Sequence, residues 1–167
     1  TIGYEILARW QHPTRGLLLP NLFIPIAEDT GNIGELTYHL LARAVRDAKD
    51  RSPQTFLSLN VSPRQFGDPM LAARIMSILT EAGFPPQRLE IEITETAVVQ
   101  RLDEAKVMLE SLHNLGIRIA LDDFGTGYAG LHHLRELQFD TLKIDRSFIT
   151  NMLENPEEAK IVEAIVG

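Results

Sequence analysis

The chain has 167 residues, no cysteine and a formal net charge of −7 at pH 7. The missing cysteines exclude disulfide bonds and thiolate metal sites within these residues, and the negative charge disfavours nonspecific DNA binding, which depends on a basic surface. No apolar run approaches the ~20 residues of a membrane span, and no signal peptide is recognisable. We therefore expect a cytoplasmic α/β domain without a membrane span of its own, whether or not its parent protein is anchored to a membrane.

Five segments have the apolar pattern of short strands, and three have the spacing of amphipathic helices. The predicted strands are residues 4–10, 55–61, 89–95, 117–121 and 141–145. The predicted helices cover residues 36–48, 71–79 and 102–112, and the third ends near Gly116, a suitable helix stop. Strands that alternate with helices of this length are typical of a parallel α/β sheet or barrel.

The most informative motif follows the fourth predicted strand, in residues 121–128. There an apolar run ends in two adjacent carboxylates, Asp122 and Asp123, and then a loop with two glycines. Two carboxylates placed together call for a cation, and oxygen ligands suit Mg²⁺ or Mn²⁺. In isolation, however, such a motif is more often an ordinary turn with a solvated aspartate.

The other predicted strands also carry polar residues near their ends: Glu5, Asn60, Glu92 and Lys143. The successive intervals from Asn60 to Glu92, Asp122 and Lys143 are 32, 30 and 21 residues, which are plausible lengths for single βα units. The carboxyl ends of such strands meet on one rim, and in a (β/α)₈ barrel that rim is where catalysis takes place. The pattern therefore predicts a site with three carboxylates and one amide oxygen.

Such a site suits chemistry at phosphorus. Asp123 could reach a second metal ion, and two ions ~3.5–4 Å apart can activate a water and stabilise an in-line displacement. Lys143 could orient that water, and Arg9, on the same face of a strand as Glu5, could bind a phosphate oxygen. Enolisation or aldol chemistry on a metal-binding barrel would fit the same residues.

Each of these residues also has a purely structural explanation. Glu90, Glu92 and Glu95 could line a solvated strand edge. Asn60 could cap the helix that follows it, and Lys143 could pair with a surface carboxylate, Asp145. The metal-site interpretation gains because one architecture places all the candidates on one rim.

Five motifs, in this order, resemble the EAL domain, the bacterial phosphodiesterase for cyclic di-GMP. They occupy residues 3–10, 60–66, 92–96, 122–128 and 142–145. The resemblance implies a TIM-like (β/α)₈ barrel, here incomplete with about five βα units, that hydrolyses cyclic di-GMP to linear pGpG with Mg²⁺ or Mn²⁺, with two ions in the site. Two departures are Ile6, where the signature has alanine, and Ala129-Gly130, where a serine pair is common.

The resemblance also implies a role for individual residues. It gives the metal ligands as Glu5, Asn60, Glu92, Asp122 and, for the second ion, Asp123, and the catalytic residues as Glu5, Lys143 and Asp123. It gives the substrate contacts as Leu7, Arg9 and Asp145. In the same way, Glu95 is expected to steady the loop from Asp123 to about Leu131, which is associated with dimer coupling in the family.

We expect residues 1–167 to be a partial EAL domain that lacks its N-terminal strand and its C-terminal units, with a final helix over residues 156–166. An unclosed parallel sheet exposes unpaired backbone and apolar faces, so the chain alone should be poorly stable and weakly active or inactive. The expected partners are cyclic di-GMP, a second copy in a homodimer, and fused sensory or diguanylate cyclase-like domains. The alternative function is a degenerate EAL domain that binds cyclic di-GMP as a sensor.

Overall fold

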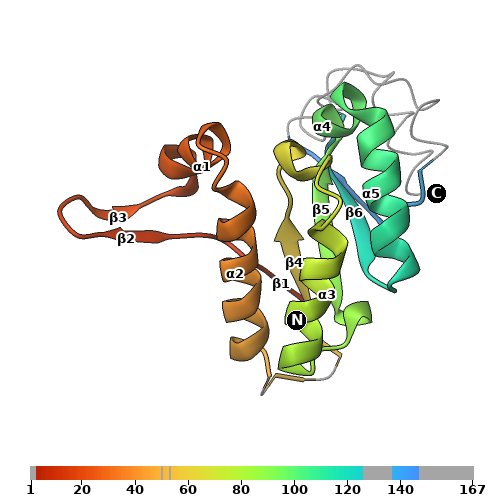
Figure 1. Cartoon of the computed structure of the whole chain (residues 1–167), viewed down its shortest axis with the longest axis horizontal. Coiled ribbons are helices and arrows are strands. Elements are labelled where there is room, and N and C mark those ends of the chain that lie inside the picture. Colours follow the sequence, from red (N-terminus) through yellow and green to blue (C-terminus); the bar gives the residue numbers. More distant parts are fainter. Residues whose placement is uncertain (1–2, 50, 53, 126–136, 147–167) are drawn as a thin grey trace.

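The computed structural model describes residues 3–49, 51–52, 54–125 and 137–146. Its centre is a curled parallel sheet of five strands in the order β1-β4-β5-β6-β7, which forms half of a barrel (Figure 1). This arrangement confirms the predicted α/β fold and the incomplete TIM-like barrel. The strands are β1 (Gly3–Glu5), β4 (Phe56–Asn60), β5 (Leu89–Thr94), β6 (Arg118–Phe124) and β7 (Thr141–Ile144).

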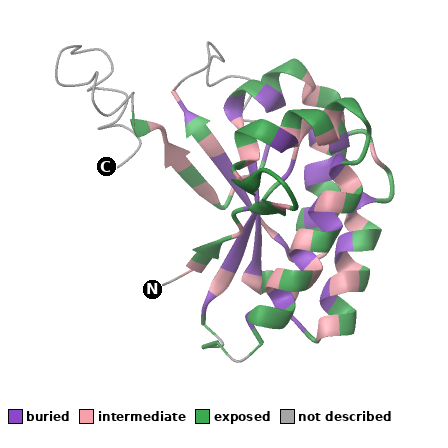
Figure 2. Cartoon of the chain, turned by 90° about the vertical axis from the view of Figure 1, so that its left-hand side faces the viewer, coloured by how far each residue is buried: buried purple, intermediate pink, exposed green. Residues whose placement is uncertain are grey.

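Three long helices lie on one face of this sheet (Figure 2). They are α2 (Ile33–Asp47), α3 (Leu71–Ala82) and α5 (Leu102–Asn114), and they correspond to the three predicted helices. Alternate strand residues face them and are fully buried, as Leu59, Ile91, Ile93, Ile119 and Leu121 illustrate. Because side chains alternate along a strand, the remaining residues of each strand face the concave side, where helices are absent among the described residues.

Left-handed glycines end two of these helices. Gly83 follows α3 with φ of 64°, a conformation that costs glycine little because it has no Cβ. At the end of α5, Gly116 has φ of 80°, its N–H donates to His113 O (2.9 Å), and Ile117 N–H donates to Leu112 O (3.2 Å). This pair of bonds is a Schellman-type cap, and it confirms the helix stop predicted at Gly116.

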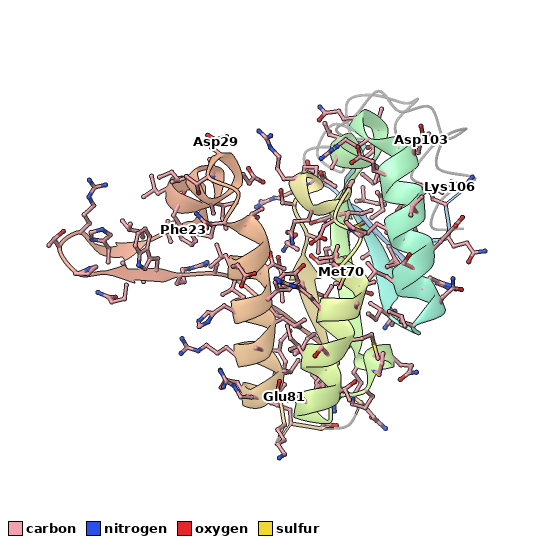
Figure 3. The ribbon with its side chains drawn as sticks, in the orientation of Figure 1. Phe23, Asp29, Met70, Glu81, Asp103 and Lys106 are labelled. Atoms are coloured by element: carbon pink, nitrogen blue, oxygen red, sulfur yellow. The ribbon has the colours of Figure 1, made fainter. Side chains whose placement is uncertain are left out.

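A hairpin and a short helix follow β1 and were not predicted. The hairpin consists of β2 (Trp10–His12) and β3 (Gly16–Leu18), leads into α1 (Pro20–Asp29) and projects away from the sheet (Figure 1). Phe23 of α1, labelled in Figure 3, is buried and meets the Trp10 ring edge-on, with ring centroids 5.9 Å apart. The aromatic contact therefore ties the hairpin to α1.

Several predicted boundaries were wrong. The first strand was predicted over residues 4–10, but it leaves the sheet after Glu5, and the last bond to β4 is from Ile6 N–H to Ser58 O (2.8 Å). The fourth extends to Phe124, so Asp122 and Asp123 lie within β6, not in a loop. The third ends at Thr94, where α4 (Glu95–Gln100) begins. Two 3₁₀ turns, η1 (Pro63–Gln65) and η2 (Pro86–Arg88), complete the described elements.

Two expectations fall outside the described residues: the final helix over residues 156–166, and the path of the loop from Gly125 towards Leu131. Within the described part, no helix is long and apolar enough to cross a membrane.

Candidate active site

Strand register places the predicted site residues on the concave face of the sheet. Asn60 lies directly opposite Glu92, and Glu92 lies opposite Ala120, two residues before Asp122. Residues in register, and residues two apart on one strand, point to the same face. Glu5 lies on this face as well, because its register partner, Ser58, is two residues before Asn60. Lys143 lies there because it is two residues after Thr141, the register partner of Ala120.

The amide of Asn60 joins the ends of β1 and β4. Its Nδ2 donates a hydrogen bond to Glu5 Oε1 over 2.9 Å. The alternative that Asn60 caps the next helix was wrong, because the cap of η1 is Ser62, whose hydroxyl accepts from Arg64 N–H (3.2 Å). The Asn60 side chain is therefore directed to the candidate site.

Glu92 is the most deeply buried acid of the rim. Its side chain is 0% exposed, and Lys143 Nζ donates to its Oε1 from β7, across β6. Its second oxygen, Oε2, is buried without a hydrogen-bond partner among the described residues. A buried carboxylate oxygen without a donor is costly, so this atom is suited to contact a cation or a proton donor from a ligand.

Burial also decides against two of the structural alternatives. Glu90, Glu92 and Glu95 are each 1% exposed, so they do not line a solvated strand edge. Lys143 does not form the predicted surface pair with Asp145, because its ammonium contacts the buried Glu92.

The environment holds Lys143 in its charged form. Desolvation by burial, the largest single influence, lowers the pKa of Lys143, but the hydrogen bond to Glu92 and the negative charges of Glu92, Asp122 and Glu5 outweigh it and raise the pKa above its ordinary value. The residue therefore provides a persistent positive charge at the rim.

Asp123 stands where β6 becomes irregular. It has φ of 55°, and the β6–β7 register shifts between Leu121 and Phe124. Desolvation by burial, followed by the charges of Asp122 and Asp145, raises the pKa of Asp123. Two neighbouring negative charges thus oppose the ionisation of Asp123, and a divalent cation close to its carboxylate would favour the ionised form.

Glu95 is positioned as the first residue of α4, directly after β5. Thr94 caps this helix by accepting from Ala97 N–H, and the buried Glu95 carboxylate accepts from Gly125 N–H (2.8 Å) through Oε2. The bond joins α4 to the end of β6, where the chain leaves the described residues. Gly125 belongs to the loop that Glu95 is expected to steady, and that role stays a prediction.

Two of the expected substrate contacts, Leu7 and Arg9, line different cavities. Arg9 was expected on the strand of Glu5, which was wrong because residues 6–9 are not in β1; its Nη1 donates to Ala8 O (2.7 Å). Leu7 is 55% exposed and lines one cavity together with Asn60, Ser62 and Thr94. Asp145 follows β7, and its N–H donates to Phe124 O (3.1 Å).

The donor set fits a hard divalent cation. Within the described ranges, no three His, Asp or Glu side chains already stand together as a metal-binding group. The oxygen donors Glu5, Asn60, Glu92 and Asp122 nevertheless share one face. Glu92 also presents a buried oxygen that no described residue contacts as a donor. All-oxygen ligation of this kind suits Mg²⁺ or Mn²⁺.

Two contacts near the site, one half-buried and one buried, were missed in the sequence. Glu28 of α1 accepts from the Ser62 hydroxyl over 2.6 Å, which ties the unpredicted helix to the loop after Asn60. Glu90 binds side chains of three other strands, one layer below Glu92. The only sequence signal for Glu90 was its position two residues before Glu92, which puts both on one face of a strand.

Comparison with known proteins agrees with this architecture. The family model described as EAL domain matches residues 1–167. A solved structure described as the PaMucR phosphodiesterase in complex with c-di-GMP is 37% identical, with a TM-score of 0.86; the match covers 99% of this chain and 68% of that chain. The FimX EAL domain from Pseudomonas aeruginosa bound to c-di-GMP is 25% identical, also with a TM-score of 0.86, and the match covers 98% of this chain and 66% of that chain.

Among curated relatives, the cyclic di-GMP phosphodiesterase NbdA of Pseudomonas aeruginosa is 38% identical over 167 residues, and an uncharacterised Synechocystis protein, sll1895, is 42% identical over 168 residues. Each match covers 98% of this chain, but the chain spans only 21% of the length of NbdA and 24% of that of sll1895. By the family match over its whole length, the chain belongs to the EAL domain family.

Proposed function

We propose that this chain provides the metal-binding rim of a phosphodiesterase domain that hydrolyses cyclic di-GMP to linear pGpG. The observation that carries the proposal is the Glu92–Lys143 pair, which lies on the same concave face as the Asn60–Glu5 pair and Asp122. In the part of the chain that the structure describes, the second oxygen of Glu92 has no hydrogen-bond partner. The relatives described as cyclic di-GMP phosphodiesterases, such as NbdA, support the choice of substrate.

In this proposal Glu5, Asn60, Glu92 and Asp122 hold a Mg²⁺ or Mn²⁺ ion, and Asp123 serves a second one. Bound there, the ions would polarise the phosphodiester and supply a nucleophilic water at neutral pH. Lys143 remains protonated, so it acts as a cation that offsets charge developing on the phosphate and orients the attacking group, not as a base.

The substrate is proposed to contact Leu7, Arg9 and Asp145. The exposed Leu7 lines an apolar cavity that reaches Asn60, and such a wall suits a flat base. Arg9 would release the carbonyl of Ala8 to bind a phosphate oxygen, since a guanidinium forms stronger bonds with an anion than with a neutral carbonyl.

The first test is turnover of cyclic di-GMP by the full-length natural protein that contains these residues. We expect conversion to pGpG with Mg²⁺ and with Mn²⁺, and none with a chelator. The second candidate function is a sensor without turnover, which the likeness to the FimX EAL domain bound to c-di-GMP favours. Binding of cyclic di-GMP without conversion would overturn the enzyme and support the sensor.

We also propose that residues 1–167 are part of a larger EAL domain within a multidomain protein. A 37% identical relative, MucR of Pseudomonas aeruginosa, is described as a bifunctional diguanylate cyclase/cyclic di-GMP phosphodiesterase, and the match covers 25% of its length. For the protein that contains this chain, we propose a similar fusion to a sensory or diguanylate cyclase-like domain. We also propose that it acts in the cytoplasm and forms a homodimer.

The 167-residue chain alone is predicted to be poorly stable and to show no turnover above background. Among the described strands, β1 pairs only with β4 and β7 only with β6, so each leaves a backbone edge open to aggregation. Urea unfolding and pGpG formation, compared with those of the full-length protein, check this prediction. Turnover by the isolated chain at the rate of the full-length protein would contradict it.

Replacing Glu95 by alanine is predicted to lower turnover about tenfold or more, by analogy with the loss of other residues that orient metal ligands. The substitution removes the acceptor of Gly125 N–H, which follows the strand that carries Asp122 and Asp123. Initial rates at saturating metal measure the effect. Glu95→Gln keeps a carbonyl acceptor and should therefore lose less turnover than Glu95→Ala. If both variants lost the same turnover, the hydrogen bond to Gly125 would not be the cause.

A further inference from the structure

A second polar layer lies on the concave face, below the proposed metal ligands. Its centre is Glu90, whose side chain is 2% exposed. Glu90 Oε1 accepts from the Ser58 hydroxyl of β4 (3.2 Å), and Oε2 accepts from the Thr141 hydroxyl of β7 (2.8 Å). Arg118 of β6 contributes a positive charge 3.5 Å from Oε2, so both carboxylate oxygens of this buried acid are satisfied.

This layer and the site above it join β5 to β7 in the same way. Glu90 binds Thr141, and Glu92, two residues later, binds Lys143, two residues after Thr141. Both contacts pass over β6, which lies between the two strands. Ala120 occupies β6 at this height, directly opposite both Glu92 and Thr141, and its methyl group leaves space for the contacts to cross.

The lower contact matters because backbone pairing does not fix Lys143. The regular β6–β7 register includes Ala120–Thr141 and Leu121–Leu142, and then shifts before Phe124. Lys143 lies within this interrupted stretch. On the concave face, Thr141 is therefore the last residue of β7 in regular register below Lys143, and a side-chain bond that holds Thr141 to β5 restricts how far Lys143 can move from Glu92.

We propose that Thr141 and Glu90 are positioning residues that hold Lys143 against Glu92 for the reaction. The inference rests on the proposed function and assigns it two further residues, neither of which touches the substrate. The Thr141 hydroxyl suits the task because it donates to Glu90 and also accepts from Arg118 Nη2 (3.4 Å), so its orientation is fixed from two sides.

The test compares three variants of the full-length protein: Thr141→Val, Thr141→Ser and Ser58→Ala. Thr141→Val keeps the shape of the side chain and loses the hydroxyl, whereas Thr141→Ser keeps the hydroxyl. Ser58→Ala removes the other hydroxyl donor of Glu90 but leaves the link to β7 intact. We expect kcat to fall about tenfold in Thr141→Val at unchanged KM, and to stay within about twofold of wild type in the other two.

Urea unfolding of the same proteins separates positioning from stability. A structural role alone predicts that Ser58→Ala and Thr141→Val, which each remove one donor to Glu90, lose stability and kcat alike. Equal kcat in all variants, or a kcat loss that Ser58→Ala shares, would overturn the positioning role while wild-type turnover still supported the proposed function. Absence of turnover in the wild type would instead overturn the proposed function, and the positioning role with it.

Discussion

Replacing Glu92 by glutamine is expected to reduce the kcat of cyclic di-GMP hydrolysis by about 10²–10³-fold, the size of effect seen when one preorganised electrostatic contact in an active site is lost. The substitution keeps the size of the side chain and removes its charge. Glu92 is fully buried, so the Lys143 ammonium would lose its counter-charge in a desolvated place. Oε2, which has no hydrogen-bond donor among the described residues, would also become a weaker ligand for a divalent ion.

Two measurements check this expectation: kcat at saturating Mn²⁺, and Mn²⁺ affinity by calorimetry in the absence of substrate. We expect both to fall. Glu110→Gln is the matched control, because it makes the same chemical change at an exposed position of α5. This variant should behave as wild type. If Glu92→Gln bound Mn²⁺ normally and turned over at the wild-type rate, Glu92 would not be a metal ligand.

Replacing Lys143 by methionine is expected to lower kcat by about 10²-fold and to leave KM nearly unchanged. Methionine keeps much of the apolar stem and removes the charge that contacts Glu92. A residue that acts on the transition state changes kcat more than substrate binding. Lys49→Met, at an exposed position after α2, is the control. A rise in KM with unchanged kcat would place Lys143 in substrate binding instead.

The pH dependence of the same enzyme tests the protonation state of Lys143. Its pKa is raised, because the bond to Glu92 and the nearby carboxylates outweigh desolvation. A raised pKa means that the folded protein keeps the proton to higher pH. The stabilising contribution of the Lys143–Glu92 pair is therefore present below the unfolded-state pKa of ~10.4 and is lost as pH rises through the higher folded-state value. We therefore expect that Lys143 does not lose its proton below pH ~9. Over that range, the dependence of kcat on pH should have the same shape in the wild type and in Lys143→Met.

The motifs named residues that the sheet brings to one face, whereas local patterns misplaced several element boundaries around them. Strands β4 to β7 are where apolar runs indicated them, and register then places Asn60, Glu92, Asp122 and Lys143 on one face. Parallel strands in register necessarily gather the residues near their carboxyl ends on one rim. The roles of these residues in catalysis remain predictions.

Local patterns failed where long-range contacts decide the structure. β1 pairs with β4, which is distant in the sequence, and the unpredicted hairpin after β1 packs on α1 through the contact between Trp10 and Phe23. The sequence did not reveal that Glu90 and Glu95 are buried, because acidic residues at alternating positions are also typical of a solvated strand edge. Only their partners elsewhere in the fold distinguish the two cases. Those partners, Thr141 and Gly125, are 51 and 30 residues away.

The sequence alone determined the alternation of strands and helices, the stop at Gly116 and the residue types of the rim, because these depend on periodicity, backbone freedom and side-chain chemistry over short distances. Only the tertiary structure decided which acids are buried, that Lys143 pairs with Glu92 and not Asp145, and that Asn60 is directed to Glu5. Burial and pairing depend on which side chains of neighbouring strands lie opposite one another. A one-residue change of register would send each of these side chains to the other face.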